Sequence, residues 1–182
     1  MLSSPMIKTL LMAVAAAAAS VPVMAGDGAL SRRVCYESET PALYCYTGND
    51  DIPQDVATED VTFIASYLRS YGRQISTGRL FVMKAADAPD CAEWLLYSRN
   101  TAAAYAKKIN TTSDSAVLFE DIANTIDGGT GLVRRSGIYQ CGTAGGSFGV
   151  QVNATAPAYN APTYVSAGYV TDGVLVKIVA NI

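Results

Sequence analysis

The chain has 182 residues, which suits one compact domain, and half of them are apolar while 16% are charged, which excludes a chain that is disordered throughout. Its formal net charge of −3 disfavours nucleic acid as a partner, because an acidic domain repels a phosphate backbone. Histidine is absent, so histidine-based catalytic triads are excluded and the commonest zinc ligand is missing.

Residues 1–25 are predicted to be a secretory signal peptide. Lys8 supplies the positive start, residues 9–19 form a mostly apolar run, and Val23 and Ala25 place small residues at the positions that signal peptidase reads. Cleavage is expected after Ala25. The apolar run is shorter than the roughly 20 residues of a membrane-spanning helix, and no second run of that length follows. We therefore expect a secreted, extracellular protein without a membrane span.

Arg32 and Arg33 form a dibasic pair at the end of residues 26–33, a short segment that contains glycine. Such a pair is a site for kexin-type proteases of the fungal secretory pathway, whose acidic pockets accept two consecutive cations. Cleavage there predicts a propeptide at 26–33 and a single disulfide-bonded domain at 34–182; the alternative is a solvated arginine pair on a tail. Two later pairs are expected on the solvated surface: Lys107 with Lys108, and Arg134 with Arg135.

The first elements of the domain follow from residue patterns. Residues 42–47 are rich in tyrosine and lie between proline and glycine, which predicts a short strand. A helix is predicted from Thr58, as its cap, to Gly72, with Glu59 and Asp60 in its first turn. Its apolar residues recur at helical spacing along one face: Val61, Ile64, Ala65, Leu68 and Tyr71.

Strands follow at residues 79–84 and 91–98. Residues 102–109 fit a strand that continues the second of these, and a helix is the alternative. A second helix is expected to begin at Ser113 or Asp114 and to end before Gly128. Two more strands are predicted at 136–141 and 148–152, joined by a flexible glycine-rich connection.

Together these elements predict an α+β fold. The order β-α-β-β-α-β between residues 42 and 141 is that of a ferredoxin-like split plait, in which two helices lie on one face of the sheet. Residues 163–170 and 174–179, joined by a turn with Asp172 and Gly173, are predicted to add a C-terminal β-hairpin.

Four cysteines in a secreted chain, without a Cys-x-x-Cys pair, predict two disulfides rather than a metal site: Cys35, Cys45, Cys91 and Cys141. In the predicted plait the first strand separates the strands of Cys91 and Cys141, which places them about 9.5 Å apart. A disulfide needs Cα atoms within about 7 Å, so the 91–141 pairing is disfavoured. Cys45 then bonds to Cys91 or to Cys141, and Cys35 bonds to the other. Two Asn-x-Thr sequons are candidate glycosylation sites, at Asn110 and Asn153.

The remaining catalytic option is a pair of carboxylates, as in a glycoside hydrolase. The candidates are Glu93, Glu120, Asp121 and Asp127. Glu93 and Trp94 are neighbours on a predicted strand and point to opposite faces, so we expect Trp94 in the core and Glu93 in solvent. Asp121 falls on the mainly apolar face of the second helix, where a buried carboxylate needs hydrogen bonds, so we expect it at the edge of that face.

No metal and no cofactor are expected. The acidic loop with Asn49, Asp50, Asp51 and Asp55 does not have the spacing of an EF-hand. The loop Gly142–Gly149 lacks the lysine and the following helix of a phosphate cradle.

Tyrosine outnumbers phenylalanine 11 to 4. A tyrosine ring combines apolar area with a polar tip, which suits a recognition surface. The candidate binding residues are Tyr139, Tyr159, Tyr164 and Tyr169.

Three stretches carry a family resemblance: Asp90-Cys91, FEDIANTIDGG at 119–129 and GIYQCG at 137–142. They resemble secreted fungal effectors with the necrosis-inducing-factor domain, although residues 101–115 lack the further cysteine of that domain. The predicted strand order is similar to that of the smut-fungus killer toxins, small disulfide-bonded α/β plaits released by kexin cleavage.

The resemblance implies a non-catalytic fungal virulence protein that binds a host or competitor target, either a protein or a glycan. Two alternatives come from other classes. One is a small secreted hydrolase that cuts cell-wall polysaccharide with two carboxylates, and the other is a structural or adhesive cell-wall protein.

Overall fold

The computed structural model describes residues 39–88, 92–130 and 135–182. Some predicted features lie outside these ranges: the signal peptide with Ala25, the dibasic pair Arg32 and Arg33, the cysteines Cys35 and Cys91, and Arg134.

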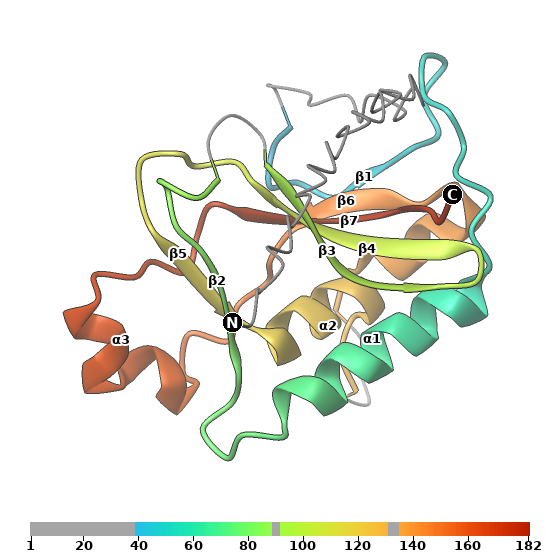
Figure 1. Ribbon diagram of the computed structural model, residues 1–182. Coiled ribbons are helices and arrows are strands. Elements are labelled where there is room, and N and C mark those ends of the chain that lie inside the picture. The colour runs from blue at the N-terminus through green and yellow to red at the C-terminus, as the bar shows by residue number, and fades with distance from the viewer. Residues whose placement is uncertain (1–38, 89–91, 131–134) are drawn as a thin grey trace, which may run out of the picture. The chain divides into compact units, whose positions relative to one another are not determined.

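Five strands form one antiparallel sheet (Figure 1). In sheet order they are β1 (Tyr44–Cys45), β6 (Gly146–Gly149), β7 (Val174–Ala180), β4 (Ala102–Lys108) and β3 (Glu93–Arg99). The two edges are β1 and β3, and β7 lies at the centre between β6 and β4. A second antiparallel sheet pairs β2 (Leu80–Met83) with β5 (Ser115–Leu118).

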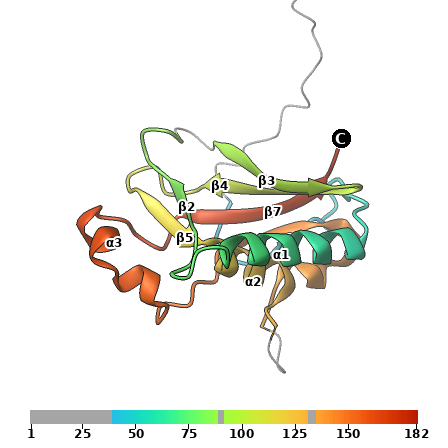
Figure 2. The same ribbon diagram turned by 60° about the horizontal axis from the view of Figure 1, so that its bottom comes forward.

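Two helices, α1 (Thr58–Gly72) and α2 (Phe119–Asp127), pack against each other and against one face of the large sheet (Figure 2). Apolar side chains fill the space between the helices and the sheet, among them Val61, Ile64, Leu68, Ile122, Ile126, Val176 and Ile178. Burial of this apolar surface is the main stabilising term of the fold. The helices approach closely at Gly72, because a Cβ atom there would lie 3.1 Å from the Cβ atom of Phe119. The predicted α+β class, with both helices on one face, is confirmed.

Three short helices complete the described chain: η1 (Ile138–Ala144), η2 (Pro157–Asn160) and α3 (Pro162–Ser166). The last two pack on the β2–β5 sheet through a small core with Leu118, Tyr159 and Tyr164. None of the helices in the described part of the chain has the length and apolar character needed to cross a membrane.

The strand order of the predicted plait is wrong. That plait places the first strand inside the sheet, but β1 is an edge strand that pairs with β6. The strand predicted at 79–84 forms as β2, yet it joins the small sheet. The prediction of a C-terminal hairpin is also wrong. Pro162 begins α3, and β7 pairs with β4 and β6. Proline fits the first turn of a helix, since the N–H that it lacks has no partner there.

Two local predictions are corrected as well. The second helix begins at Phe119, because Ser115–Leu118 extends and pairs with β2. Residues 136–141 do not form a strand; most of them belong to η1, whose kink at Gly142 has φ of 58°. The predicted flexible connection contains β6. The predicted end of the second helix is confirmed. α2 stops before Gly128, which adopts the left-handed conformation with φ of 80°.

Cys45 forms a disulfide with Cys141, with 5.2 Å between the Cα atoms. This is one of the two pairings left open for Cys45, and it excludes the disfavoured 91–141 bond. The bond joins the edge strand β1 to η1, where Cys141 precedes β6, the pairing partner of β1.

The prediction of a solvated Lys107-Lys108 pair is wrong, because each residue is only 1% exposed. Successive residues of β4 point to opposite faces, so the two ammonium groups lie in different polar environments. Lys108 Nζ donates to Met83 O at 2.9 Å and to Ser115 Oγ at 2.7 Å. Burial lowers the pKa of Lys108, and the attraction of Asp114 and Asp172 opposes that shift.

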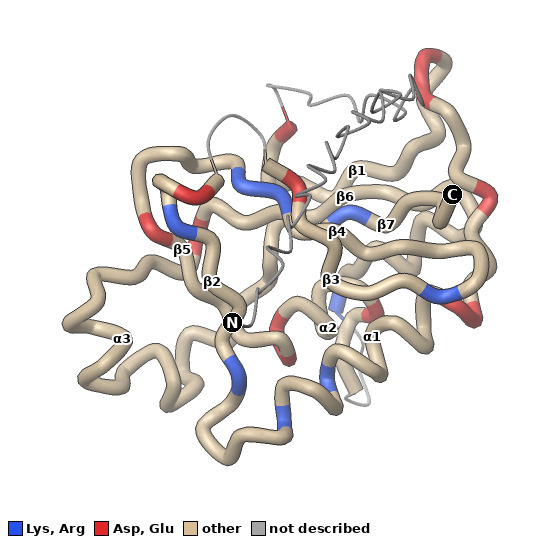
Figure 3. Tube along the Cα trace, viewed as in Figure 1, with Lys and Arg blue, Asp and Glu red and all other residues tan. Residues whose placement is uncertain are grey.

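Lys107 belongs to a buried network on the sheet face that is turned away from the helices. Glu39, which precedes β1, contacts Lys107 and lies 3.0 Å from the Nζ atom of Lys177 on β7. Lys177 also donates to Glu93 on β3 at 2.8 Å, so Glu93 is not the solvated residue that was expected. Figure 3 marks the basic positions on β4 and β7 inside the sheet. Two lysines face two glutamates, which leaves the network without net charge.

Candidate functional site

An aromatic strip runs along the seam between α1 and the edge strand β3. We define the aromatic strip as the four rings of Phe63, Tyr67, Tyr71 and Tyr97 with the two arginines Arg79 and Arg99. Phe63 is 38% exposed and Tyr67 is 40% exposed, so part of each ring remains accessible to a partner.

The strip follows from the periodicity of α1. Phe63, Tyr67 and Tyr71 are four residues apart, so they lie one above another on the helix, beside the core face that holds Ile64 and Leu68. This repeat is visible in the sequence, although only Tyr71 belongs to the predicted apolar face of the helix.

Tyr97 reaches the strip because β3 contains a β-bulge. The pairing register with β4 shifts between Leu95 and Tyr97, which turns both Leu96 and Tyr97 toward the helix layer. The ring of Tyr97 then stacks on that of Tyr67 with 3.8 Å between the centroids and 21° between the planes. No sequence pattern marks this bulge.

Most ring faces in the strip are already covered. Tyr67 is stacked on Tyr97 on one side and is parallel to Tyr71, with 6.4 Å between those centroids. The guanidinium of Arg99 lies 3.5 Å from the ring centroid of Phe63, and that of Arg79 lies 4.1 Å from that of Tyr71. A partner therefore meets ring edges, hydroxyl groups and guanidinium groups rather than open ring faces.

Asp60 holds one end of the strip in place. It is buried in the first turn of α1, where its carboxylate accepts hydrogen bonds from the Thr101 backbone N–H at 3.1 Å and from Asn100 Nδ2 at 2.9 Å. The same carboxylate lies 3.5 Å from Arg99 Nε, the arginine that covers Phe63. The hydrogen bond from the Thr101 backbone is the main reason that the pKa of Asp60 is lowered.

Replacing Asp60 with asparagine is expected to lower thermal stability at neutral pH and to have less effect in acid. The pKa of Asp60 is below its ordinary 3.8 in the folded protein, so its contribution is complete above the unfolded pKa and is lost as the pH falls through the folded pKa. Circular dichroism melts from about pH 7 to about pH 2 measure the difference in Tm. The control is Glu59→Gln, an exposed carboxylate in the same turn. An equal effect of both substitutions would contradict this role.

All four candidate catalytic carboxylates have fixed partners. Glu93 is bound to Lys177, and Glu120 pairs with Arg73 at 2.5 Å. Asp127 forms a buried ion pair with Arg69 at 2.7 Å, between α1 and α2. Asp121 also has a partner, but that partner is a tyrosine and not a cation. A carboxylate that is committed to an ion pair is a poor general base, since its partner stabilises the anion.

Asp121 is buried and its Oδ2 atom accepts a hydrogen bond from Tyr159 Oη at 2.6 Å. Burial raises the pKa of Asp121, and the hydrogen bond from Tyr159 opposes that shift. The Tyr159 hydroxyl also accepts from the Leu118 backbone N–H at 2.8 Å, so the dyad fixes the junction of β5 and α2. Asp121 is thus buried and hydrogen-bonded, and the expectation that it lies at the edge of the apolar face is wrong.

The four tyrosines predicted to bind a partner do not form one surface. Tyr159 is 7% exposed and Tyr164 is 5% exposed, and both contribute to the small core. The Tyr164 hydroxyl donates to Ala116 O at 2.9 Å. Tyr169 packs against Tyr164, with 5.6 Å between centroids, and Tyr139 is half-buried in η1. Burial of the first two leaves little of either ring for a partner.

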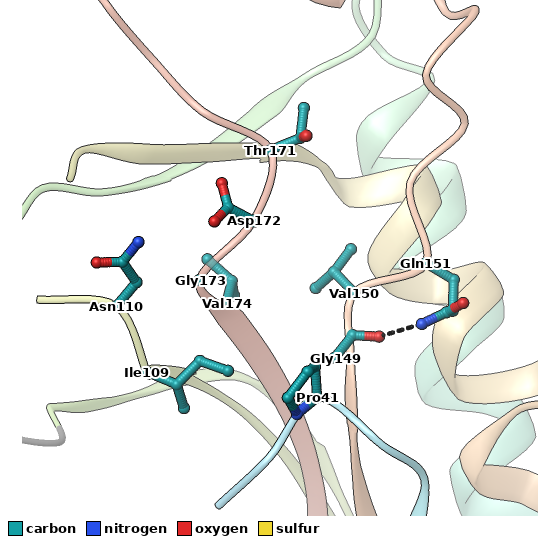
Figure 4. A pocket seen from close by; sticks show the side chains of 10 residues that line it. All are labelled: Pro41, Ile109, Asn110, Gly149, Val150, Gln151, Thr171, Asp172, Gly173 and Val174. Carbon is teal, nitrogen blue, oxygen red and sulfur yellow. Dashed lines mark hydrogen bonds between the residues drawn. The ribbon is translucent and has the colours of Figure 1, made fainter. Parts of the chain in front are cut away.

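Two pockets are lined by residues outside the aromatic strip. One, of about 260 Å³, lies between the loops that follow β4 and β6 and the turn before β7 (Figure 4). Its lining combines the apolar side chains of Pro41, Ile109, Val150 and Val174 with the polar ones of Asn110, Gln151, Thr171 and Asp172. The other, of about 310 Å³, is polar and lies beside Asp121.

The acidic loop is built around Asp51, whose Oδ2 atom accepts hydrogen bonds from Tyr44 Oη at 2.8 Å and from the Gly48 backbone N–H at 2.7 Å. Within the described ranges, no group of three or more histidine, cysteine, aspartate or glutamate residues is arranged to hold a metal ion.

The chain matches no protein-family model, no curated protein and no solved structure.

Proposed function

We propose that this chain is a secreted fungal effector or killer-toxin-like protein that binds a protein target of a host or competitor through the aromatic strip. The observation that carries the proposal is the strip itself: exposed tyrosine and phenylalanine edges with an arginine over the ring at either end. Tyrosine and arginine are enriched where protein interfaces concentrate their binding energy.

The covered ring faces favour a protein over a glycan. Sugar recognition by aromatic residues uses open ring faces, whereas here the faces of Tyr67, Tyr97 and Phe63 are occupied by one another and by Arg99. Guanidinium groups at both ends favour carboxylates on the partner. The target surface is therefore acidic.

Secretion through the fungal pathway completes the proposal. The signal peptide ends at Ala25, kexin-type cleavage follows Arg33, and the mature domain is 34–182. A second disulfide joins Cys35 to Cys91, the two cysteines left once Cys45 pairs with Cys141. The resemblance to fungal effectors with the necrosis-inducing-factor domain supports this route, and the fixed partners of the four carboxylates support a protein that binds without catalysis.

Replacing both Tyr67 and Tyr97 with alanine is expected to reduce the biological activity of the purified protein at least tenfold, because the two stacked rings form the middle of the strip. Activity is measured as cell death in host tissue or growth inhibition of a competing fungus across a dilution series. The matched control is Tyr44→Ala, an exposed tyrosine on the opposite edge of the sheet.

Unchanged activity in the strip variant would overturn the proposed binding surface. A loss of activity in Glu120→Gln or Asp121→Asn, with the strip variant fully active, would instead favour the cell-wall hydrolase. Thermal melts of every variant confirm that each remains folded at the assay temperature.

A further inference from the structure

The sequon at Asn153 lies on an exposed turn at the rim of the polar pocket beside Asp121. Asn153, Gln151, Asn124 and Arg135 all line this pocket of about 310 Å³. Asn153 itself is exposed, as are the two residues that follow it.

The turn presents one particular atom of Asn153. Thr155 Oγ1 donates to Asn153 Oδ1 at 2.8 Å, and the Thr155 backbone N–H donates to the same oxygen at 3.3 Å. The Oδ1 atom is thus engaged, while the Nδ2 atom has no acceptor among the described residues. An N-linked sugar is attached to Nδ2.

The pocket offers hydrogen-bonding groups for a sugar. Gln151 Nε2 is committed to Gly149 O at 2.8 Å, which leaves its Oε1 atom available. Asn124 Oδ1 accepts from Arg69 at 3.2 Å, which leaves its Nδ2 atom available. Arg135 is exposed and contributes a charged donor. An N-acetyl carbonyl and ring hydroxyls need this mixture of donors and acceptors.

We propose that Asn153 carries an N-linked glycan and that its first sugar, N-acetylglucosamine, lies in this pocket. The inference rests on the secretory route of the proposed function. In the transfer, Asn153 Nδ2 bonds to C1 of a pyrophosphate-linked lipid oligosaccharide as the bond from C1 to the pyrophosphate oxygen breaks. The amide proton passes to a base of the transferase, and the lipid pyrophosphate leaves with the electron pair.

Asn110 provides an internal comparison. Its sequon forms the same turn, with Thr112 Oγ1 donating to Asn110 Oδ1 at 2.7 Å. However, Asn110 is half-buried, and a Cβ atom on Gly173 would lie only 2.6 Å from its own Cβ atom. The neighbouring pocket combines apolar side chains such as Ile109 and Val150 with polar ones (Figure 4), so it is less polar than the pocket beside Asn153.

The first test is the intact mass of the full chain recovered from the medium of a fungal secretion host. Asn153→Gln and Thr155→Ala are each expected to lose one glycan, whereas Thr155→Ser keeps the sequon and the glycan. The same glycan mass on wild type and Asn153→Gln would overturn the proposal. Recovery from the medium reports secretion separately, so a secreted protein without this glycan refutes the inference and leaves the proposed function standing.

The second test places the sugar in the pocket. An endoglycosidase trims the glycan to one N-acetylglucosamine, and the trimmed protein is expected to melt a few degrees above Asn153→Gln. Arg135→Ala is expected to remove most of this difference and to leave the Tm of an Asn153→Gln background unchanged. Equal Tm values for the trimmed protein and Asn153→Gln would show that the sugar does not contact the pocket.

Discussion

Replacing both Cys45 and Cys141 with alanine is expected to lower the free energy of unfolding by about 4 kcal/mol. The two cysteines are 96 residues apart, so their bond restricts a large part of the unfolded chain. It also secures β1, a two-residue strand held by its pairing with β6. For a domain of this size the Tm is expected to fall by about 8 to 16 °C.

Urea denaturation of the oxidised protein and of the double variant measures this loss. Wild type in a thiol reductant is the companion sample. Its free energy of unfolding is expected to fall at least as far as that of the double variant, because reduction opens every disulfide. A non-reduced peptide map verifies the pairing by linking the peptides of Cys45 and Cys141. A loss below about 1 kcal/mol would contradict the stabilising role of the bond.

Replacing Arg69 with alanine is expected to lower the free energy of unfolding by about 3 to 5 kcal/mol, because it leaves the buried carboxylate of Asp127 without its counter-charge. Arg69 donates to both carboxylate oxygens of Asp127, at 2.7 and 2.8 Å, and to Asn124, so it joins α1 to α2. The side chains of this ion pair are 8% and 11% exposed.

The matched control for Arg69 is Arg73, which immediately follows α1 and caps its C-terminus. Its ion pair with Glu120 also connects the two helices, but the side chains are 57% and 39% exposed. Solvent screens such a pair, so Arg73→Ala is expected to cost less than about 1 kcal/mol. Chemical denaturation of both variants gives the comparison. Similar losses at the two positions would show that burial does not set the strength of these pairs.

Much of the secondary structure could be predicted where local pattern and final contacts agree. In α1 the apolar spacing of Val61, Ile64 and Leu68 and the stop at Gly72 agree with the helix that forms, although its N-cap is Ala57 and not Thr58. The segments of β3 and β4 are extended, as predicted, but the prediction that residues 102–109 continue the preceding strand is wrong, because the chain turns back and β4 pairs antiparallel with β3. Val117 and Leu118 fit either a helix or a strand, and pairing with the distant β2 decides the outcome.

The strand order and the burial of charged side chains could not be predicted from the sequence, because both depend on residues far apart in the chain. The environment of Lys107 is set by Glu39, 68 residues away, and that of Lys108 partly by Met83, 25 residues away. In the aromatic strip, the repeat of Phe63, Tyr67 and Tyr71 is local and predictable. The stacking of Tyr97 is not, since it depends on a β-bulge.

The central position of β7 governs when this protein becomes able to fold. β7 is the last described strand to leave the ribosome, yet β4 and β6 meet only through it. Before residues 174–180 emerge, the nascent chain holds two unjoined parts of the large sheet, β1 with β6 and β3 with β4, each with an open edge. The large sheet can therefore close only after residues 174–180 have been synthesised.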